Sequence, residues 1–456
     1  MKKIIVIGGG PAGYPAALKA ASLGAQVILI EKNVLGGVCL NCGCIPSKSF
    51  LDSAHRLNAL NKIAALADEN AGALAKQIFQ ARDFQKIKAR QQAATRKLVG
   101  GIGFLLKKAG VEVVQGEASF VNETQLRVKK ADGSEEILTA DGVILATGTQ
   151  AFFPPPFDHI KEQIYDNSTI FNMPELPRSL AVVGGGVIGC EMADCFNTLG
   201  VEVHIIEMQS CLLPAEDENG ARAVSQALSK RGVKIHTGVC ATAVTRENDL
   251  WTIALSDGEQ IAAQAVLAAI GRTVDLSALH LENIGVSWTR KGVTVNPQTL
   301  QLKNNIYAAG DVNGLLLLAH AATRQGEVAA SNLCGVSAKY NNNEVPRAIY
   351  TTPELACVGL TRAEAEEAGF TVKSHKAFLL ASGRAVTQDQ TDGYYELISD
   401  AQTGKLLGAV FVGANASELI HVVSVALAAE MTVAQLGGVI FAHPTLAESI
   451  GEAAHK

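Results

Sequence analysis

The sequence predicts an α/β protein with two Rossmann-like dinucleotide-binding domains and a C-terminal α+β domain. A glycine-rich turn occurs twice, each time between a short apolar strand and a helix-forming segment. In both copies the following strand ends in a glutamate at the same distance from the turn. The strands and helix expected after residue 346 contain no such turn, which favours a third domain of a different kind.

The first copy extends from a strand at residues 3–7 to Glu31, which ends a second strand. Its turn carries the glycines of the GxGxxG pattern, namely Gly8, Gly10 and Gly13. Glycines at these positions allow a sharp turn and close approach of a pyrophosphate, whose charge is stabilised by the N-terminus of the following helix. The acidic side chain at the end of the second strand is expected to bind a ribose hydroxyl.

The second copy repeats this arrangement between residues 180 and 207. Its acid is Glu207, and its glycines are Gly184, Gly186 and Gly189. The last glycine and the acid are 18 residues apart in both copies (13 to 31 and 189 to 207), so the chain is expected to bind two dinucleotides. Glu207 would repel the 2′-phosphate of NADP, and no arginine follows it over residues 208–210. The second site is therefore expected to take NAD.

The segments between and after the two copies divide the chain further. Residues 83–108 are predicted to be helical and residues 111–146 rich in strands, and a Pro-rich linker follows at 152–156. Strands are also predicted at 266–270, 306–309, 395–398 and 406–412, and a helix at 416–429. With a polar boundary at 339–346, the predicted domains are 1–148, 149–270, 271–338 and 339–456.

The composition excludes several classes of function. Hydrophobic residues make up 48% of the 456 residues, which is enough to bury several cores. The net charge of −5 provides no field that would attract nucleic acid. No apolar run approaches the ~18–20 residues of a membrane span, and the run at 4–7 is too short for a secretory signal. We expect a cytoplasmic protein that binds neither nucleic acid nor membranes.

Three of the nine cysteines crowd together as Cys39, Cys42 and Cys44, just after the first glycine-rich unit. Cys39 and Cys42 form a CxxC pair, Cys39 and Cys44 form a CxxxxC pair, and all three could ligate a metal. A fourth Cys or His at metal spacing is missing nearby, which disfavours a metal. Their position within reach of the first dinucleotide favours redox chemistry, because a flavin there would link the thiols to a second, nicotinamide cofactor. The other six are interpreted as buried small hydrophobic residues: Cys190, Cys195, Cys211, Cys240, Cys334 and Cys357.

Redox chemistry at these thiols needs a proton acceptor that works near neutral pH, because the thiolate is the reactive form, and histidine is the natural choice. His443 precedes Pro444, which disfavours helical geometry at the histidine and can begin a helix at its own position. Glu448 would then lie about one turn into this helix and could orient the imidazole, as the third member of a triad does. The competing interpretation of His443 is a helix-capping surface residue.

The run GGVCLNCGCIPSK (36–48), together with the two glycine-rich units, resembles the flavin-dependent pyridine nucleotide–disulfide oxidoreductases. The resemblance covers nearly the whole chain. It includes ATG (146–148), GGGVIGCE (184–191), GR (271–272), AAGD (308–311), LAH (318–320), YTTPELACVGLT (350–361) and HPTLAE (443–448). It implies an FAD domain (1–148), an NAD domain (149–270), a central segment that completes the FAD site (271–338) and an interface domain (339–456) that forms a homodimer.

The resemblance also implies catalytic roles. Cys39 and Cys44 would form the redox disulfide, with Cys39 meeting the substrate and Cys44 contacting the flavin. His443, supplied by the partner subunit, would be the base, and Glu448 would hold it.

The cofactor-binding residues implied by the resemblance belong to both dinucleotide sites. Lys48 and Glu191 would form an ion pair beside the flavin, and Asp311 would bind its ribityl chain. The remaining ones are Gly8, Gly10, Gly13, Glu31, Ala118, Thr147, Gly148, Gly184, Gly186, Gly189, Glu207, Gly271, Leu318, Ala319 and His320.

Within the family the chain is most similar to members that oxidise dihydrolipoamide, which implies oxidation of a dihydrolipoyl group with reduction of NAD+ to NADH. A separate lipoyl-carrying protein of a 2-oxoacid dehydrogenase or glycine-cleavage system would supply that group. Phe441, Cys42 and Glu396 depart from the pattern of those members, and Cys42 adds a third thiol that could shuffle the disulfide. The alternatives are a related NAD(P)H-dependent disulfide or metal-ion reductase and a non-catalytic redox-sensing flavoprotein subunit.

Overall fold

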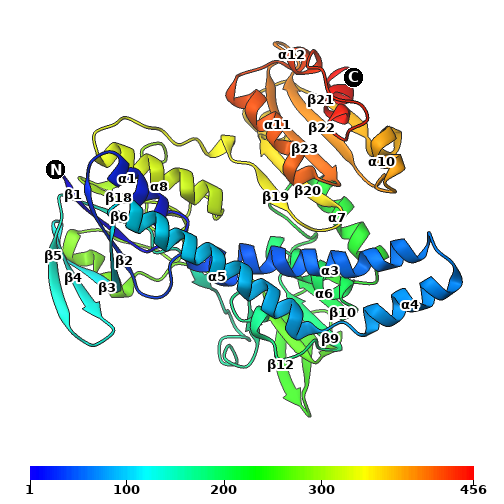
Figure 1. Ribbon diagram of the computed structural model, residues 1–456, viewed down its shortest axis with the longest axis horizontal. Helices are drawn as coiled ribbons and strands as arrows, with labels where there is room; N and C mark the ends of the chain where they lie inside the picture. The colour runs from blue at the N-terminus through cyan, green and yellow to red at the C-terminus, as the bar shows by residue number, and fades with distance from the viewer.

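The computed structural model describes residues 1–456, apart from the side chain of Asn61. Figure 1 shows three parts: one carrying the N-terminus, a second beside it, and a C-terminal sheet above the second. Two long helices, α3 (Cys44–Ala64) and α5 (Phe84–Lys108), run along the first two parts. The α/β fold class expected from the sequence is confirmed.

The first sheet has eight strands in the order β17-β18-β6-β1-β2-β3-β4-β5. They are β1 (Lys3–Ile7), β2 (Gln26–Glu31), β3 (Glu112–Asn122), β4 (Gln125–Lys130), β5 (Glu135–Thr139), β6 (Gly142–Leu145), β17 (Gln301–Lys303) and β18 (Ile306–Ala308). The central strands pair in parallel, with β1 between β2 and β6 and with β18 beside β6. Helices α1 (Gly13–Ser22) and α8 (Ala319–Leu333) pack together next to this sheet (Figure 1). Residues 4–7 of β1 are all buried, as is typical of a parallel strand covered on both faces.

The second sheet is parallel and has the order β11-β10-β9-β15-β8. Its strands are β8 (Tyr165–Asp166), β9 (Ser179–Val183), β10 (Glu202–Glu207), β11 (Lys234–Thr237) and β15 (Ala265–Ala268). Its helices are α6 (Val187–Thr198) and α7 (Glu218–Lys230). An antiparallel sheet lies beside it, made of β12 (Ala241–Glu247), β13 (Leu250–Leu255) and β14 (Gln260–Ala263). The chain passes between the first and second parts twice. At these two passages β7 (Gln150–Ala151) and β16 (Arg272–Thr273) form a short antiparallel pair.

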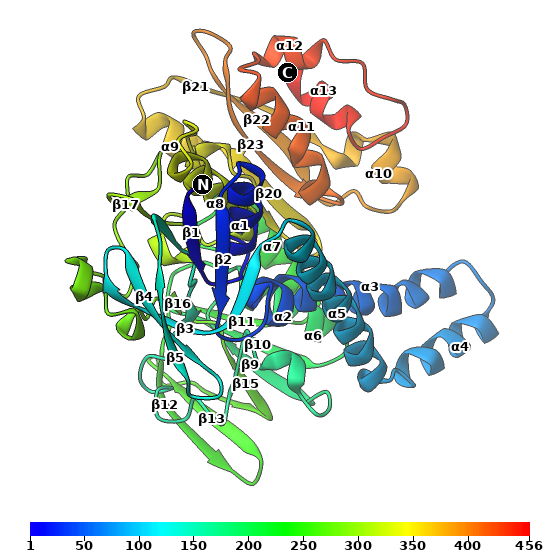
Figure 2. The same ribbon diagram turned by 60° about the vertical axis from the view of Figure 1, so that its left-hand side comes forward.

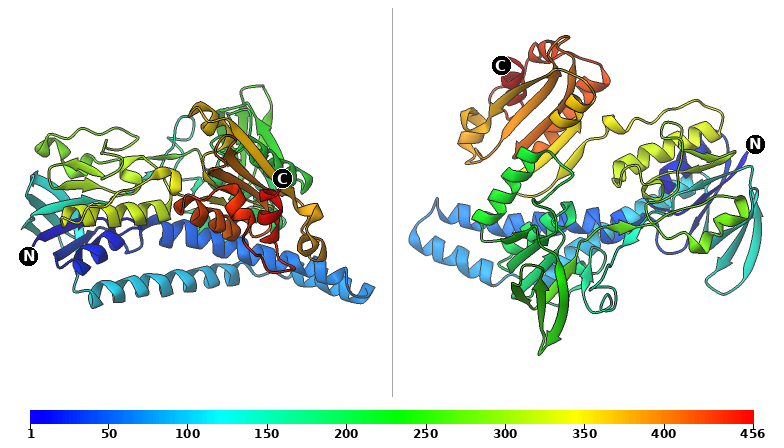
Figure 3. Two further views of the ribbon diagram at one scale, coloured as in Figure 1. Left: turned by 90° about the horizontal axis from the view of Figure 1, so that it is seen from above. Right: turned by 180° about the vertical axis from the view of Figure 1, so that it is seen from behind.

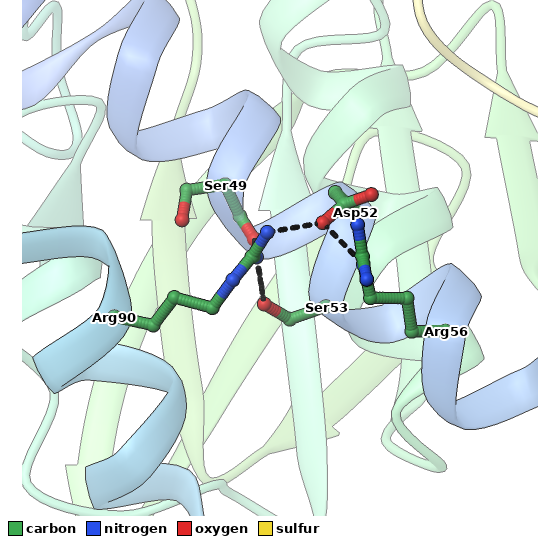
Figure 4. A network of polar contacts seen from close by, with 5 residues as sticks. All are labelled: Ser49, Asp52, Ser53, Arg56 and Arg90. Atoms are coloured by element: carbon green, nitrogen blue, oxygen red, sulfur yellow. Dashed lines mark hydrogen bonds and ion pairs between the residues drawn. The ribbon is translucent and has the colours of Figure 1, made fainter. Parts of the chain in front are cut away.

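A polar network fixes α3 against α5 (Figure 4). The Asp52 carboxylate forms ion pairs with Arg56 Nε (2.8 Å) and with the Arg90 guanidinium. Arg90 Nη1 also donates to Ser53 Oγ (2.7 Å). Below this network the ring of Phe50 packs edge-on against Phe84, with 5.8 Å between the ring centroids. These contacts hold the first turns of α3 in place. That end of the helix carries Cys44 and Lys48, two of the predicted site residues.

The far end of α3 continues into α4 (Glu69–Gln80). The two helices form a hairpin that projects beyond the three parts (Figures 2 and 3).

The C-terminal sheet is antiparallel, with the order β19-β20-β23-β22-β21. Its strands are β19 (Arg347–Ile349), β20 (Glu354–Gly359), β21 (Val372–Phe378), β22 (Tyr394–Asp400) and β23 (Leu406–Gly413). Its helices are α9 (Arg362–Glu367), α10 (Gly383–Thr387), α11 (Ala416–Ala428), α12 (Val433–Gly437) and α13 (Glu448–Ala454). One buried apolar cluster joins α3, the second sheet and one face of this third sheet, for example through Phe50, Val182 and Leu355.

Most predicted elements are confirmed. The helix expected at 83–108 is α5, and Asp83 caps it by accepting hydrogen bonds from two amides of its first turn. One prediction is wrong: no helix begins at Pro444, and α13 begins only at Glu448. The Thr445 amide donates instead to the Glu448 carboxylate (2.8 Å), which holds this segment as a turn. No helix in the described chain combines the length and the apolar character needed to cross a bilayer.

Candidate active site

The two glycine-rich turns have the same geometry. Gly8 and Gly184 have φ angles of 101° and 106°. A Cβ on Gly8 would lie 2.3 Å from the Ala146 carbonyl oxygen, just after β6, and one on Gly184 would lie 2.3 Å from the Ala269 carbonyl oxygen, just after β15. A Cβ on Gly13 or Gly189 would lie 1.8 or 1.9 Å from the carbonyl oxygen of the first glycine of the turn. Only glycine fits these four positions, so the turns can close tightly between strand and helix.

The two glutamates are held in the same way. Glu31 Oε2 accepts a hydrogen bond from the Gly9 amide, and Glu207 Oε2 accepts one from the Gly185 amide, each at 2.6 Å. The other oxygen of each carboxylate accepts from the amide two residues further on, each at 2.7 Å. An ionised carboxylate has about four acceptor sites, so each can still accept a hydrogen bond from a ribose hydroxyl.

The N-termini of the helices that follow both turns fit a phosphate. Neither α1 nor α6 has a side-chain hydrogen bond at its N-cap. In α6 this leaves the first-turn amides of residues 187–189 for an anion, whereas in α1 the Gly13 and Tyr14 amides donate to the Gly10 carbonyl oxygen (3.0 and 3.1 Å) and the positive end of the helix dipole is what remains. A Cβ on Gly10 would find its nearest atom only at 3.7 Å, and one on Gly186 would find nothing within 4 Å. The space in front of both helices is therefore open, and the residues fit two dinucleotides.

Three further predicted residues lie at the carboxyl edge of the first sheet. Thr147 and Gly148 follow β6, and Asp311 follows the neighbouring β18. The Asp311 carboxylate accepts a hydrogen bond from Thr149 Oγ1 (2.7 Å) and lies 3.8 Å from Arg272 Nε. This edge adjoins the glycine turn after β1, which is where ligands bind in open α/β sheets.

The other predicted residues of the first site differ in how they can take part. Leu318 and Ala319 form the uncapped N-terminus of α8, and His320 Nε2 lies 2.7 Å from the Pro346 carbonyl oxygen. The Ala118 side chain is buried in the core behind β3, so only its backbone can face a ligand.

The Cys39 and Cys44 thiols are hydrogen-bonded to each other. Cys39 lies in the short helix α2 (Gly37–Cys42), and Cys44 is the first residue of α3. The hydrogen bond from Cys39, with the charge of Lys48, lowers the pKa of Cys44 to about 7, although burial opposes this shift. The same hydrogen bond, with burial, raises the pKa of Cys39. Of the pairings open to the sequence, the structure brings Cys39 and Cys44 together, and it directs Cys42 to Ser168 instead.

Lys48 and Glu191 form an ion pair next to the thiols, with Nζ 2.8 Å from Oε2. Glu191 is buried in α6, and its other oxygen accepts the Tyr350 amide at 3.1 Å. Lys48 Nζ also lies 4.4 Å from the centroid of the Tyr350 ring. Burial disfavours the charge of Lys48, but the Glu191 carboxylate outweighs it and raises the pKa of the ammonium. A fixed positive charge thus lies beside Cys44.

His443 and Glu448 meet at the opposite end of the chain. His443 Nδ1 lies 2.9 Å from Glu448 Oε1, and the imidazole is 80% exposed. Hydrogen bonds from the Thr445 amide and from His443 lower the pKa of Glu448, so the carboxylate stays charged beside the ring. This pair lies just before and at the start of α13 in the C-terminal part, whereas the thiols lie on α2 and at the start of α3.

Two residues that hold the site together, Arg272 and Tyr350, were not predicted from the sequence. The Arg272 guanidinium donates to the Thr149 carbonyl (2.7 Å) and to Asn167 Oδ1 (3.0 Å), which ties the segment after the first sheet to the second part. Gly271 precedes it with φ 135°. Tyr350 contacts both members of the Lys48–Glu191 pair. Their only signals in the sequence were their places in the GR and YTTPE motifs.

Comparisons with known proteins agree with this geometry. Residues 2–326 match the model of the pyridine nucleotide-disulphide oxidoreductase family, and residues 345–454 match the dimerisation domain of the same family. The chain belongs to the pyridine nucleotide-disulphide oxidoreductases. It is therefore a member of a family of flavoenzymes that use FAD and NAD(H).

Individual relatives are similar over their whole length. A dihydrolipoyl dehydrogenase of Bacillus subtilis is 40% identical over 99% of this chain and 97% of its own, and one of Thermus scotoductus is 38% identical over 99% and 96%. The crystal structure of LpdA from Mycobacterium tuberculosis matches with a TM-score of 0.92 and 30% identity, covering 100% of this chain and 99% of that one. The HOCl-induced flavoprotein disulfide reductase RclA of Escherichia coli matches with a TM-score of 0.85 and 28% identity, covering 99% of both chains.

Proposed function

We propose that this protein oxidises a dihydrolipoyl group to the lipoyl disulfide and reduces NAD+ to NADH. The observation that carries the proposal is the contact between the Cys39 and Cys44 thiols beside the Lys48–Glu191 ion pair. A pair of thiols in contact can form a disulfide that accepts two electrons from a dithiol substrate. The similarity to dihydrolipoyl dehydrogenases over nearly the whole chain supports this substrate.

Each dinucleotide has its own half of the chain in this proposal. The residues that would hold FAD are Gly8, Gly10, Gly13, Glu31, Lys48, Ala118, Thr147, Gly148, Glu191, Asp311, Leu318, Ala319 and His320. Those that would hold NAD+ are Gly184, Gly186, Gly189, Glu207 and Gly271. When bound, FAD supplies the chemistry that the side chains lack, namely two-electron transfer between the dithiol and NAD+.

The side chains carry out the thiol chemistry. The partner subunit's His443, held by Glu448, accepts a proton from one substrate thiol, and the resulting thiolate attacks Cys39 Sγ. A substrate–Cys39 bond forms, the Cys39–Cys44 bond breaks, and Cys44 leaves as a thiolate that Lys48 stabilises. The second substrate thiol then displaces Cys39, which takes up a proton. The substrate leaves as a disulfide, and its two electrons remain in the dithiol.

The proposed assembly is a homodimer formed by the C-terminal domain, since residues 345–454 match a dimerisation domain. His443 is exposed in the single chain, as expected of a side chain that completes the site of a partner. The lipoyl group would come on a separate protein of a 2-oxoacid dehydrogenase or glycine-cleavage system. On its cysteine usage, we assign the protein to the cytoplasm.

The test is NAD+ reduction by free dihydrolipoamide, with NADP+ in a parallel assay. Rapid formation of NADH with little NADPH is expected, because Glu207 would face the 2′-phosphate of NADP+. A flavin-containing dimer that reduced neither nucleotide would contradict the substrate assignment. Equal rates with both nucleotides would contradict the role of Glu207.

A further inference from the structure

Cys42 is a thiol of the redox site that the proposed reaction does not use. It lies on α2 three residues after Cys39. Residues at positions i and i+3 of a helix have Cβ atoms about 5–6 Å apart, so a disulfide between them, which needs about 3.5–4.5 Å, forms only when the short helix adjusts. Cys39 Sγ contacts the Cys44 thiol. Cys39 therefore has Cys44 as its present partner, and Cys42 follows it one helical turn later as a second thiol.

The surroundings of Cys42 are mainly polar. It lines a cavity of about 210 Å³ whose other walls are mainly polar, with Gln91, Thr95 and Arg96 on α5 and Ser168 opposite. The Ser168 hydroxyl hydrogen-bonds to the Cys42 sulfur. Of the six cysteines interpreted as buried hydrophobic residues, Cys190, Cys195 and Cys357 are buried, whereas the interpretation is wrong for Cys211 and Cys240, which are exposed.

The charges around Cys42 set its reactivity. Burial raises the pKa of the Cys42 thiol, while the Ser168 hydrogen bond and the charge of Arg272 oppose this rise. The negative charges of Asp166 and Cys44 raise the pKa of Cys42 further. Cys42 is thus a slow nucleophile at neutral pH that becomes faster as the pH increases.

We propose that Cys42 is a third redox-active thiol, which exchanges into the Cys39–Cys44 disulfide to give a Cys39–Cys42 disulfide and a free Cys44. The step is an isomerisation. The Cys42 thiolate attacks Cys39 Sγ, the Cys39–Cys44 bond breaks, and Cys44 leaves as a thiolate, so that no external oxidant or reductant takes part.

Attack at Cys39 is favoured over attack at Cys44 because of the leaving group. A thiol of lower pKa leaves faster, and the Cys39–Cys44 hydrogen bond lowers the pKa of Cys44 and raises that of Cys39, while the charge of Lys48 favours both thiolates. The exchanged form reacts more slowly with substrate, because attack on Cys39 must then release Cys42, the poorer leaving group. The exchange therefore gives the oxidised enzyme a second form that reacts slowly with the dithiol substrate. This inference rests on the Cys39–Cys44 disulfide of the proposed function.

The experiment maps the free thiol of the oxidised holoenzyme. The oxidised enzyme is kept at about pH 8.5, where exchange is faster than at neutral pH, without added thiols and without oxygen. Samples are taken at intervals and acidified. Each sample is unfolded and labelled with N-ethylmaleimide at mildly acidic pH. Trypsin releases all three cysteines in the peptide 33–48, and fragmentation locates the label. The exposed Cys211 and Cys240 report complete labelling.

The expected result is a label that moves from Cys42 to Cys44 with time, and faster at higher pH. Ser168→Ala should slow this movement severalfold, because it removes a hydrogen bond that stabilises the Cys42 thiolate. Cys42→Ser should leave no label on Cys44 at any time. Cys211→Ser is the matched control, and the movement should be unchanged in it.

Three results would overturn the inference. A label that stays on Cys42 at every pH would show an intact Cys39–Cys44 disulfide without exchange, leaving the proposed function standing. A label on Cys39 would mean that Cys42 pairs with Cys44. If Cys39 and Cys44 are both labelled in the oxidised enzyme, the disulfide itself is absent, and the proposed function fails with the inference.

A kinetic readout is independent of the mapping. Enzyme preincubated at the higher pH should show a lag in NADH formation after dilution into dihydrolipoamide, and Cys42→Ser should abolish the lag. A lag that persists in Cys42→Ser would contradict the exchange.

Discussion

Cys44 and Lys48 lie one turn apart on α3, so their side chains share a face of the helix. The thiol also lies at the N-terminus of this helix, where the backbone dipole favours a negative charge. These features make Cys44 the thiol of the pair that ionises first. Lys48 in turn keeps its charge because Glu191 and the Tyr350 ring surround it.

The first prediction concerns the pH at which Cys44 becomes reactive. In the reduced protein, alkylation of Cys44 should show a midpoint near pH 7 and fall about tenfold per unit below it, because only the thiolate reacts. Lys48→Met should move the midpoint upward, since it removes the positive charge that favours the thiolate. The measurement is the rate of label incorporation at Cys44 as a function of pH, in the tryptic peptide 33–48 or, in Lys48→Met, in the longer peptide 33–56. Lys62→Met, at the exposed far end of α3, is the control that should leave the midpoint unchanged.

At the scale of elements, the two glycine-rich units have the same geometry, but each is proposed to bind a different cofactor. Matched substitutions in them should therefore affect different cofactors. Gly13→Ala would place a Cβ 1.8 Å from a backbone oxygen of the first turn, and Gly189→Ala would do the same at 1.9 Å in the second. Neither overlap can be relieved by moving a flexible side chain.

We therefore predict that Gly13→Ala yields protein without flavin, whereas Gly189→Ala retains its flavin and loses affinity for NAD+ at least about tenfold. Flavin absorbance of the purified protein and NAD+ titration measure the two effects. The reverse pattern would show that the two sites have been assigned to the wrong halves of the chain.

Elements with a clear periodic signal could be predicted from the sequence. The strand expected at 3–7 is β1, and the helix expected at 83–108 differs from α5 by one residue. The sequence analysis did not place α3 and α4, whose hairpin makes few buried contacts beyond residue 64 and has a correspondingly weak apolar pattern. The helix expected at Pro444 was wrong because the Glu448 carboxylate bonds to the Thr445 amide of the preceding turn.

The same distinction applies to the site. Gly8, Gly184 and the two glutamates are recognisable because their function depends on the backbone of one local unit. The choice between the three cysteine pairings depends on how α2 meets α3, which spacing alone does not determine. The contacts of Arg272 and Tyr350 join segments more than 100 residues apart, so no local pattern could indicate them.

At the scale of the whole molecule, the proposed site combines thiols from one subunit with a histidine from the other. This arrangement predicts complementation between two inactive variants. Cys44→Ser and His443→Gln should each have little dihydrolipoamide activity as homodimers, because one lacks the thiol and the other the base.

A mixed dimer of the two variants should regain up to about half of the wild-type rate, since one of its sites receives Cys44 and His443 from different chains. Differently tagged subunits, purified as the mixed dimer, allow the measurement. If the mixed dimer stays as inactive as its parents, the thiols and the histidine act within one chain.

The strand order of the first sheet has a consequence for how the protein is made. Strands β17 and β18, residues 301–308, are bound to an edge formed by residues 142–145, and the whole second sheet lies between them in the chain. On the ribosome, the second sheet can close from one continuous stretch, residues 165–268. The first sheet, although begun at residue 3, must wait with an open edge until about 300 residues have emerged. The half proposed to bind NAD+ is therefore expected to fold first, and the half proposed to bind FAD is the one in which a stalled chain is exposed to aggregation or to chaperones.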